Sequence, residues 1–463
     1  MPFADISAAD RGLALRKGRG SCAAASPAVC AVSSSTSRSS RSRSSNSTAA
    51  TSAAQQQLLQ LLVEEAAADG TAAAAEQALL QPAWPRLQEL DLSGCSRLGG
   101  SWSFLALLPQ LQSLALHSCY KVTNDTLASF AKALQRACNS SSSSFEHAPL
   151  AAPLGSSTTG SSFDRALQLN AAAAAAANQL RRLELSYTRV SDTGMAHLAA
   201  ALPQLCWLGL KGCNVGDDGL LHLLQLQQLT ALHIKHCHRV TEEGVQQLSV
   251  LSGLRDLSYG YTSMPEANDV AAAIAGQFKQ LTALDLLASE LTDQGLAAMS
   301  SLQQLQQLKL YQAAVSVDAL QQLAGQPAGR GLTCLVLYGL GRLTQLECLG
   351  AFPQLLELQL GGLCHLASAS GAVQQLALLP RLQQLTLERI NGLSVECLQQ
   401  LMAGSSSLLC LRVRGCDGVC EEDMQELAEG AASRCSSSAS VWWAASPSCD
   451  TDDEEDGWEL LPV

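Results

Sequence analysis

Leucines recur along this chain in a fixed pattern, LxxLxLxxC, whose central LxL alternates apolar positions with variable ones. The clearest copies are LQELDLSGC from Leu87, LQSLALHSC from Leu111, LCWLGLKGC from Leu205 and LTALHIKHC from Leu229. Looser copies begin at Leu180, Leu254, Leu281, Leu305, Leu332, Leu355, Leu382 and Leu408. Consecutive starts lie 23 to 27 residues apart, with one interval of 69. The pattern therefore predicts about twelve copies of one short structural unit.

The first half of each copy predicts a short strand. Successive side chains of a strand point to opposite faces, so the two leucines of LxL point inward and their neighbours point outward. One such unit cannot bury its apolar side alone, so stability accumulates as neighbouring units stack. We therefore expect parallel strands along one concave wall, with the leucines behind them.

The second half of each copy predicts a helix, as in VTNDTL from Val122, VSDTGM from Val190, VTEEGV from Val240 and LTDQGL from Leu291. A Ser or Thr hydroxyl can accept a hydrogen bond from a first-turn amide, and the following acid suits the helix dipole. The expected N-caps are Thr123, Ser191, Thr241, Thr292, Ser316 and Ser394. Strand and helix together predict an α/β leucine-rich-repeat solenoid, a horseshoe with strands on its concave face and helices on its convex face.

Composition and the repeats divide the chain into six segments. Residues 11–53 are rich in Ser, Ala and Arg and hold no acid, which is typical of a disordered arm and also of a transit peptide. The expected order is a disordered arm at 1–53, a helical cap at 54–86, repeats 1 and 2 at 87–136, an insertion with a return helix at 137–179, repeats 3 to 12 at 180–432, and a disordered acidic tail at 433–463.

The overall charge and composition exclude some classes of partner. The chain is 47% hydrophobic but only 4% aromatic, so its core is expected to be aliphatic. Its net charge of -12 argues against a binder of nucleic acid, which needs an excess of Lys and Arg. Apolar runs are too short for a membrane span. We expect a cytoplasmic protein, with the axoneme or cytoskeleton, the nucleus, or a plastid as alternatives.

Seventeen cysteines are spread along the chain, and no secretory signal opens it. Five of them occupy the last position of the repeat pattern: Cys95, Cys119, Cys213, Cys237 and Cys416. We interpret these as a ladder of reduced, buried thiols that donate weak hydrogen bonds to neighbouring loop carbonyls. Two groups could be considered for a metal, His233, His236, Cys237 and His238 or Cys410, Cys416 and Cys420, but both lack suitable spacing or orientation, so no metal is predicted.

Catalytic motifs are absent from the sequence. It contains no phosphate-binding loop, GxSxG elbow or HExxH helix, so neither an enzyme nor a cofactor is expected. The outward strand positions instead carry sparse aromatics among charges, which is the composition of interface hot spots. The predicted partner-binding residues are Trp207, Lys211, His233, Lys235, Asp256, Tyr261, Asp285, Lys309, Tyr311, Tyr338, Arg412 and Arg414.

From Leu87 to about Ala432, the repeats resemble the cysteine-containing leucine-rich repeats of F-box proteins, on LxxLxLxxC followed by [VL][TS][DE]xG[LVM]. The resemblance implies a protein-binding module that recognises substrates for a ubiquitin ligase of the SCF type, with the ligase adaptor as a second partner. No F-box pattern is found between Met1 and Arg86. The alternative is a scaffold without ligase function, in a cytoskeletal or axonemal assembly.

The acidic run from Asp450 to Asp456 leads into Trp458 and Leu461, an arrangement that resembles motifs by which autophagy receptors bind ubiquitin-like modifiers. In an extended peptide these two side chains could fill two apolar pockets while the backbone adds a strand to a partner's sheet. A solvated tail and a dileucine sorting signal, formed by Asp456, Leu460 and Leu461, are the alternatives.

Overall fold

The computed structural model describes residues 87–95, 110–132, 179–261, 264–366, 369–420, 422–427, 440–444 and 459–460. All of them belong to one compact unit, Val32–Val463. The expected arm at 1–53, the cap at 54–86 and nearly all of the insertion at 137–179 lie outside the described residues.

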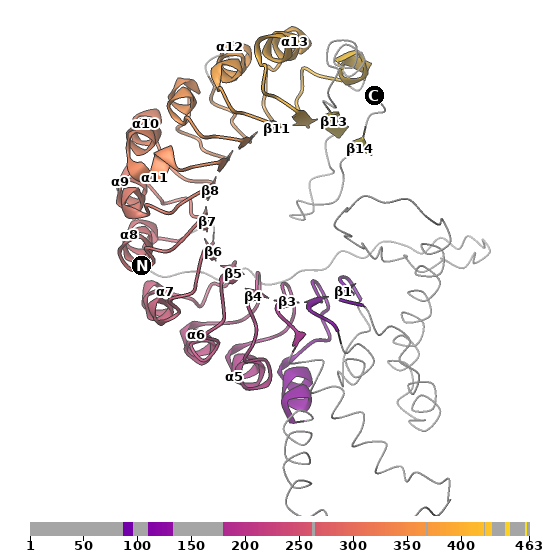
Figure 1. Ribbon diagram of the computed structural model, residues 1–463, viewed down its shortest axis with the longest axis vertical. Helices are drawn as coiled ribbons and strands as arrows, with labels where there is room; N and C mark the ends of the chain where they lie inside the picture. Colours follow the sequence, from indigo (N-terminus) through magenta and orange to yellow (C-terminus); the bar gives the residue numbers. More distant parts are fainter. Residues whose placement is uncertain are drawn as a thin grey trace, which may run out of the picture. The chain divides into compact units, whose positions relative to one another are not determined.

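One sheet runs through the unit, and each repeat contributes one strand to it in chain order. The twelve repeat strands are parallel, and each starts two residues after the first leucine of its copy, as the sequence pattern predicted. In Figure 1 they follow one another along the inner side of the stack while helices cover its outer side. The strands are β1 Glu89–Asp91, β2 Ser113–Ala115, β3 Arg182–Glu184, β4 Trp207–Gly209, β5 Ala231–Lys235, β6 Asp256–Gly260, β7 Ala283–Leu287, β8 Gln307–Tyr311, β9 Cys334–Tyr338, β10 Glu357–Gly361, β11 Gln384–Glu388 and β12 Cys410–Arg414. The predicted leucine-rich-repeat solenoid is confirmed.

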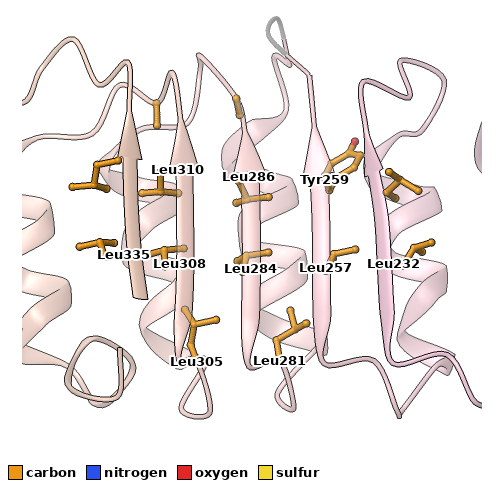
Figure 2. Close-up of a cluster of buried hydrophobic side chains, with 14 of the residues drawn as sticks. Leu232, Leu257, Tyr259, Leu281, Leu284, Leu286, Leu305, Leu308, Leu310 and Leu335 are labelled. Carbon is orange, nitrogen blue, oxygen red and sulfur yellow. The ribbon is translucent and has the colours of Figure 1, made fainter. Parts of the chain in front are cut away.

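The core is a stack of leucine layers. Strand register aligns like positions, so Leu257 of β6 lies between Leu232 of β5 and Leu284 of β7. These side chains are at most 1% exposed, and Figure 2 shows them behind the strands. Tyr259 replaces the second leucine in β6, and its buried hydroxyl donates to the carbonyl oxygen of Val240 at 3.0 Å. Each buried leucine contributes on the order of 1.5 to 3 kcal/mol, which explains why the layers stay together.

Short helices follow the strands. They are α5 Asp192–Ala201, α6 Asp217–Leu223, α7 Glu242–Gln247, α8 Ala267–Gln277, α9 Asp293–Ala298, α10 Val317–Gly325, α11 Pro327–Arg330, α12 Ala369–Gln375 and α13 Val395–Gly404, with 3-10 turns at Leu248–Val250, Met299–Ser301, Glu347–Ala351 and Leu376–Leu378. Residues 124–132 and 422–427 are also helical. Between β9 and β10 a 3-10 turn takes the place of the α-helix.

Side-chain capping follows the prediction only in part. Ser316 and Ser394 accept hydrogen bonds from the amides of Ala319 and Cys397, whereas Ser191, Thr241 and Thr292 make no such bond. The expected side-chain caps at these last three positions were therefore wrong.

Residues at the start of the helix of the preceding repeat contact these N-cap residues, and Asp293 also accepts from the amide and hydroxyl of Ser316, whose oxygen still caps α10. The Asp217 carboxylate accepts from both the amide and the hydroxyl of Thr241, at 2.9 and 2.8 Å. Asn268 Oδ1 accepts from the amide and hydroxyl of Thr292 in the same way. Asn124 accepts from the Ser191 amide, and its side-chain amide donates to the Ser191 hydroxyl. Thr123, the remaining expected cap, uses its amide to donate to the Thr126 hydroxyl. The Asp and Asn side chains at this position therefore join consecutive repeats, through residues 24 positions apart for Asp217 and Asn268 and 67 positions apart for Asn124.

The cysteines at the last repeat position lie where the loops stack. Cys119, Cys213 and Cys237 are buried, and each Sγ–H donates to a leucine carbonyl of the preceding repeat at 3.1 to 3.2 Å. Cys416 does so at 3.8 Å, and Cys95 is half-buried. All the cysteines among the described residues are free thiols.

We expect these thiols to resist alkylation. Burial raises the pKa of the Cys237 thiol to about 12, so the thiolate fraction at pH 8 is on the order of one in ten thousand. Native protein treated with iodoacetamide at pH 8 should be modified at the exposed Cys364 and Cys420 and spared at Cys237, as measured by peptide mass spectrometry. Because the unfolded thiol ionises near pH 9 and the folded one does not, stability should also fall above that pH. Rapid native labelling of Cys237 would contradict the ladder.

The sheet continues past the twelfth repeat. Strand β13, Ser440–Ala444, pairs parallel with β12, and β14, Glu459–Leu460, pairs antiparallel with β13. We expected a disordered tail from residue 433, but these two segments are strands. The sequence SVWWA of β13 is rich in strand-forming residues, and the open edge of β12 offers it backbone partners. Trp458 and Leu461 lie outside the described residues.

Candidate functional site

The strand register arranges the outward side chains of the concave face in rows. The last strand position forms one row across β5 to β12: Lys235, Gly260, Leu287, Tyr311, Tyr338, Gly361, Glu388 and Arg414. The middle position forms another across the same strands: His233, Ser258, Asp285, Lys309, Val336, Gln359, Thr386 and Arg412. Residues far apart in the sequence thus become neighbours.

Trp207 is the centre of the first cluster, which covers β3 to β6. The Arg182 guanidinium lies 3.4 Å from the centroid of the Trp207 ring, and the His233 ring meets it edge-on at 4.9 Å. His233 Nε2 in turn lies 3.2 Å from Asp256 Oδ2. Beside the cluster, the Glu184 carboxylate lies over the backbone of Gly209 and accepts from the Ser186 amide. Each of these four side chains therefore contacts the next one across β3 to β6, from Arg182 to Asp256.

Lys235 is the centre of the second cluster, which covers β5 to β9. Its ammonium lies 2.7 Å from Asp285 Oδ1 and 3.9 Å from the centroid of the Tyr311 ring. The Tyr311 and Tyr338 rings are 6.1 Å apart. The Ser258 hydroxyl donates to the other Asp285 oxygen at 3.4 Å. Both charged side chains are largely buried, 13% exposed for Lys235 and 19% for Asp285, which strengthens their attraction and holds the rings in place.

The second cluster depends on a glycine. Lys235 and Asp285 stand on β5 and β7, with β6 between them, and the residue of β6 in register with Lys235 is Gly260. Because Gly260 has no side chain, the lysine can pass over it and reach the carboxylate. Gly260 also has a φ of +117°, a conformation that L side chains rarely adopt.

The other predicted site residues fall around these two clusters. Lys309 is in register with Asp285, and Arg412 and Arg414 stand on β12, where Arg412 donates to Gln384 Oε1 at 3.4 Å. Tyr261 follows β6, packs against the core and meets the His238 ring at 5.1 Å, so it lies beyond the strand face. Lys211 lies 5.4 Å from the Tyr187 ring centroid, also past the end of its strand.

Three contributors were missed from the sequence: Arg182, Ser258 and Tyr187. Arg182 and Ser258 occupy outward strand positions of their copies, so the alternation could have identified them. Tyr187 lies just past the LxL leucines, where the local pattern carries no signal for orientation.

Neither of the two groups considered for a metal forms a metal-binding site in the described residues. The His236 and His238 rings are 6.5 Å apart, while Cys237 Sγ is directed at the Leu210 carbonyl. Within the described part of the chain, no set of three or more His, Cys, Asp or Glu side chains is placed to hold a metal ion. In the same residues, no helix has the length and apolar character to cross a bilayer.

Fold and site together define a leucine-rich-repeat solenoid with an aromatic and charged concave face. No family model and no curated protein match the chain. Among solved structures it is similar to an internalin of Listeria monocytogenes, at 14% identity and TM-score 0.40, over 87% of this chain and 96% of that one. It is also similar to internalin C2 of that organism (19%, 0.31, over 47% and 83%) and to TLR13 in a complex with single-stranded RNA (17%, 0.41, over 73% and 44%).

Proposed function

We propose that this chain is a non-catalytic binding module whose concave face, between Trp207 and Tyr338, holds a protein partner. The observation that carries the proposal is the Lys235 cluster, in which Asp285, Tyr311 and Tyr338 are already linked across five strands. Tyr, Trp and Arg are enriched at the centres of protein interfaces, where they contribute most of the binding energy.

Preorganisation supports this use of the clusters. Immobilising a flexible side chain on binding costs about 0.5 to 1.5 kcal/mol, and here the ion pair and ring contacts hold Lys235 and Tyr311 before any partner arrives. The rings belong to a rigid sheet and not to a loop, so a partner meets them in one geometry. The mixture of acids and bases favours one orientation of that partner.

Truncating the two clusters should weaken binding without unfolding the protein. We expect Trp207→Ala with Tyr311→Ala to cost about 2 kcal/mol or more of binding energy, because both rings are half-buried on the outward face and neither belongs to the leucine core. A matched control is Leu378→Ala, which removes a large apolar side chain that is 79% exposed in the 3-10 turn Leu376–Leu378, outside both clusters and outside any strand. The measurement is calorimetric titration with a captured partner, alongside thermal melts. A double variant that melts as badly as a leucine-core variant would show that the rings are structural.

For the class of complex, we propose a substrate receptor of a ubiquitin ligase. The support is the resemblance of the repeats to those of F-box proteins. The test is affinity purification of the full chain from native cells, with the Trp207→Ala, Tyr311→Ala variant in parallel. Adaptor and cullin subunits retained by both baits, with a further protein lost from the variant, would support the receptor. Reproducible absence of adaptor and cullin would rule it out, while leaving the concave-face proposal to its own test.

A further inference from the structure

A second surface lies beside the concave face, at the ends of the strands of repeats 2 to 6. It is formed by the loops that follow β2 to β6, residues 117–121, 186–189, 211–214, 235–239 and 260–261, and we name it the carboxyl rim. Backbone hydrogen bonds join these loops one to the next: Ser118 to Ser186, Tyr187 to Lys211, Gly212 to Lys235 and His236 to Gly260, at 2.6 to 2.9 Å. The rim is therefore a continuation of the sheet and has a defined geometry.

The carboxyl rim has an excess of basic residues, although the whole chain is acidic. Its residues include Lys121, Arg189, Lys211, Lys235 and Arg239 together with His117, His236 and His238, whereas the whole chain has a net charge of -12. The loop after β6 continues to an acid, Glu266, which interacts with Tyr261. Lys235 and Arg239 pair with Asp285 and Asp192. Among the described residues, no carboxylate forms an ion pair with Lys121, Arg189 or Lys211. Three neighbouring repeats thus present cations whose charge is not neutralised locally.

Aromatic rings lie among these cations. The Tyr187 ring meets the His117 ring edge-on at 5.2 Å and lies 5.4 Å from the Lys211 ammonium. Tyr120 is 55% exposed, and the His238 and Tyr261 rings are 5.1 Å apart. Rings beside cations lower the cost of desolvating a charged contact and add flat apolar area for a partner's side chains.

The backbone at the rim argues that these rings are not needed by the fold. Tyr187 and His236 have φ angles of 57°, in the left-handed region. Other repeats place glycine at this position, as at Gly212, Gly339 and Gly415, while Ser118, Gln312 and Arg389 are further non-glycine residues in this conformation. A bulky residue is uncommon there, so the two rings carry a backbone cost that glycine would avoid. Tyr187 and His236 thus occupy a position at which glycine is sufficient for the fold.

We infer that the carboxyl rim binds a short acidic peptide segment of a protein partner. The charge is complementary, and five repeats span four strand spacings, ~19 Å, which equals about six residues of extended peptide. A peptide fits better than nucleic acid, because a longer polyanion would extend past repeat 2 to the acidic residues Glu89 and Asp91 of β1. Lys235 belongs both to this surface and to the second concave cluster, so the test relies on Arg189 and Lys211, which belong to neither cluster, and either proposal can fail without the other.

The test is fluorescence anisotropy of the full chain with a labelled peptide of about six consecutive glutamates, as sized by the extended-strand rise, at 0.15 M salt or below. The charge-reversal variant Arg189→Glu, Lys211→Glu should lower the affinity at least tenfold. The matched control Arg330→Glu, Arg342→Glu, with the same change of net charge on other exposed arginines, should lower it less than twofold. Equal losses in both variants, or tighter binding of a single-stranded oligonucleotide of equal charge, would overturn the inference.

A second variant separates binding from stability. Tyr187→Gly relieves the left-handed backbone and removes the ring, so the melting temperature should stay the same or rise while peptide affinity falls at least threefold. A lower melting temperature with unchanged affinity would show that Tyr187 serves the fold and would overturn its role at the rim.

Discussion

Leu208→Ala should destabilise the solenoid by about 3 kcal/mol or more, the largest effect expected from a single truncation to alanine. Leu208 is fully buried at the centre of β4, in register with Leu183 of β3 and Leu232 of β5. Removing its branched end loses apolar burial and leaves a cavity that two hydrogen-bonded neighbours cannot close. Because each repeat is stabilised mainly by the adjacent ones, the loss should spread to repeats 3 to 5.

Urea unfolding followed by circular dichroism measures the change, and hydrogen exchange locates it. The matched control is Trp207→Ala, one residue earlier on the opposite face, which should cost no more than about 1 kcal/mol because it breaks only the contacts to Arg182 and His233. Similar losses in the two variants would mean that the assigned inward and outward faces of β4 are incorrect.

Gly260→Ala should cost at least about 2 kcal/mol, although it adds only one methyl group. Gly260 combines a φ of +117° with close packing, and a Cβ at this position would overlap the backbone carbonyl of Leu287 on β7. A backbone atom cannot rotate away as a side chain can, so β6 and β7 would have to separate. Separation of β6 from β7 would also move Asp285 away from Lys235, so partner binding at the concave face should fall together with stability.

The matched control for this prediction is Gly276→Ala in α8. A Cβ there meets nothing within 4 Å, so the helix should gain about 0.5 to 1 kcal/mol. Thermal melts of the two variants give the comparison. An unchanged melting temperature for the Gly260→Ala variant would contradict both the left-handed backbone of Gly260 and the close approach of β7.

The concave site could be foreseen only in part. Alternation along each strand identified Trp207, Lys235, Asp285 and Tyr311 as outward residues, because a two-residue period is a local property. The contacts among them were not foreseen. Whether Lys235 pairs with Asp285 depends on what stands on the strand between, and a motif alignment gives no reason to single out one glycine there.

Helix capping was likewise predicted in part from the local sequence and decided in part by tertiary contacts. The sequence correctly placed a Ser or Thr before α5, α7 and α9, but the partner of each hydroxyl came from the preceding repeat. An isolated helix offers such a residue only first-turn amides, from which its oxygen accepts. The stack adds the Asp217 carboxylate, to which the Thr241 hydroxyl donates a charge-assisted hydrogen bond. Local rules predict the residue type, and stacking selects the bond.

By itself the sequence determined the repeat, its period, the twelve strand positions and the inward leucines, because all of these depend on spacing within about 25 residues. The tertiary structure alone decided which side chains meet across strands, where the cations of the carboxyl rim gather, and that β13 extends the sheet. The physical reason is that in a solenoid the neighbours of a residue lie one repeat away, so its partners are set by register and by the size of the intervening side chains.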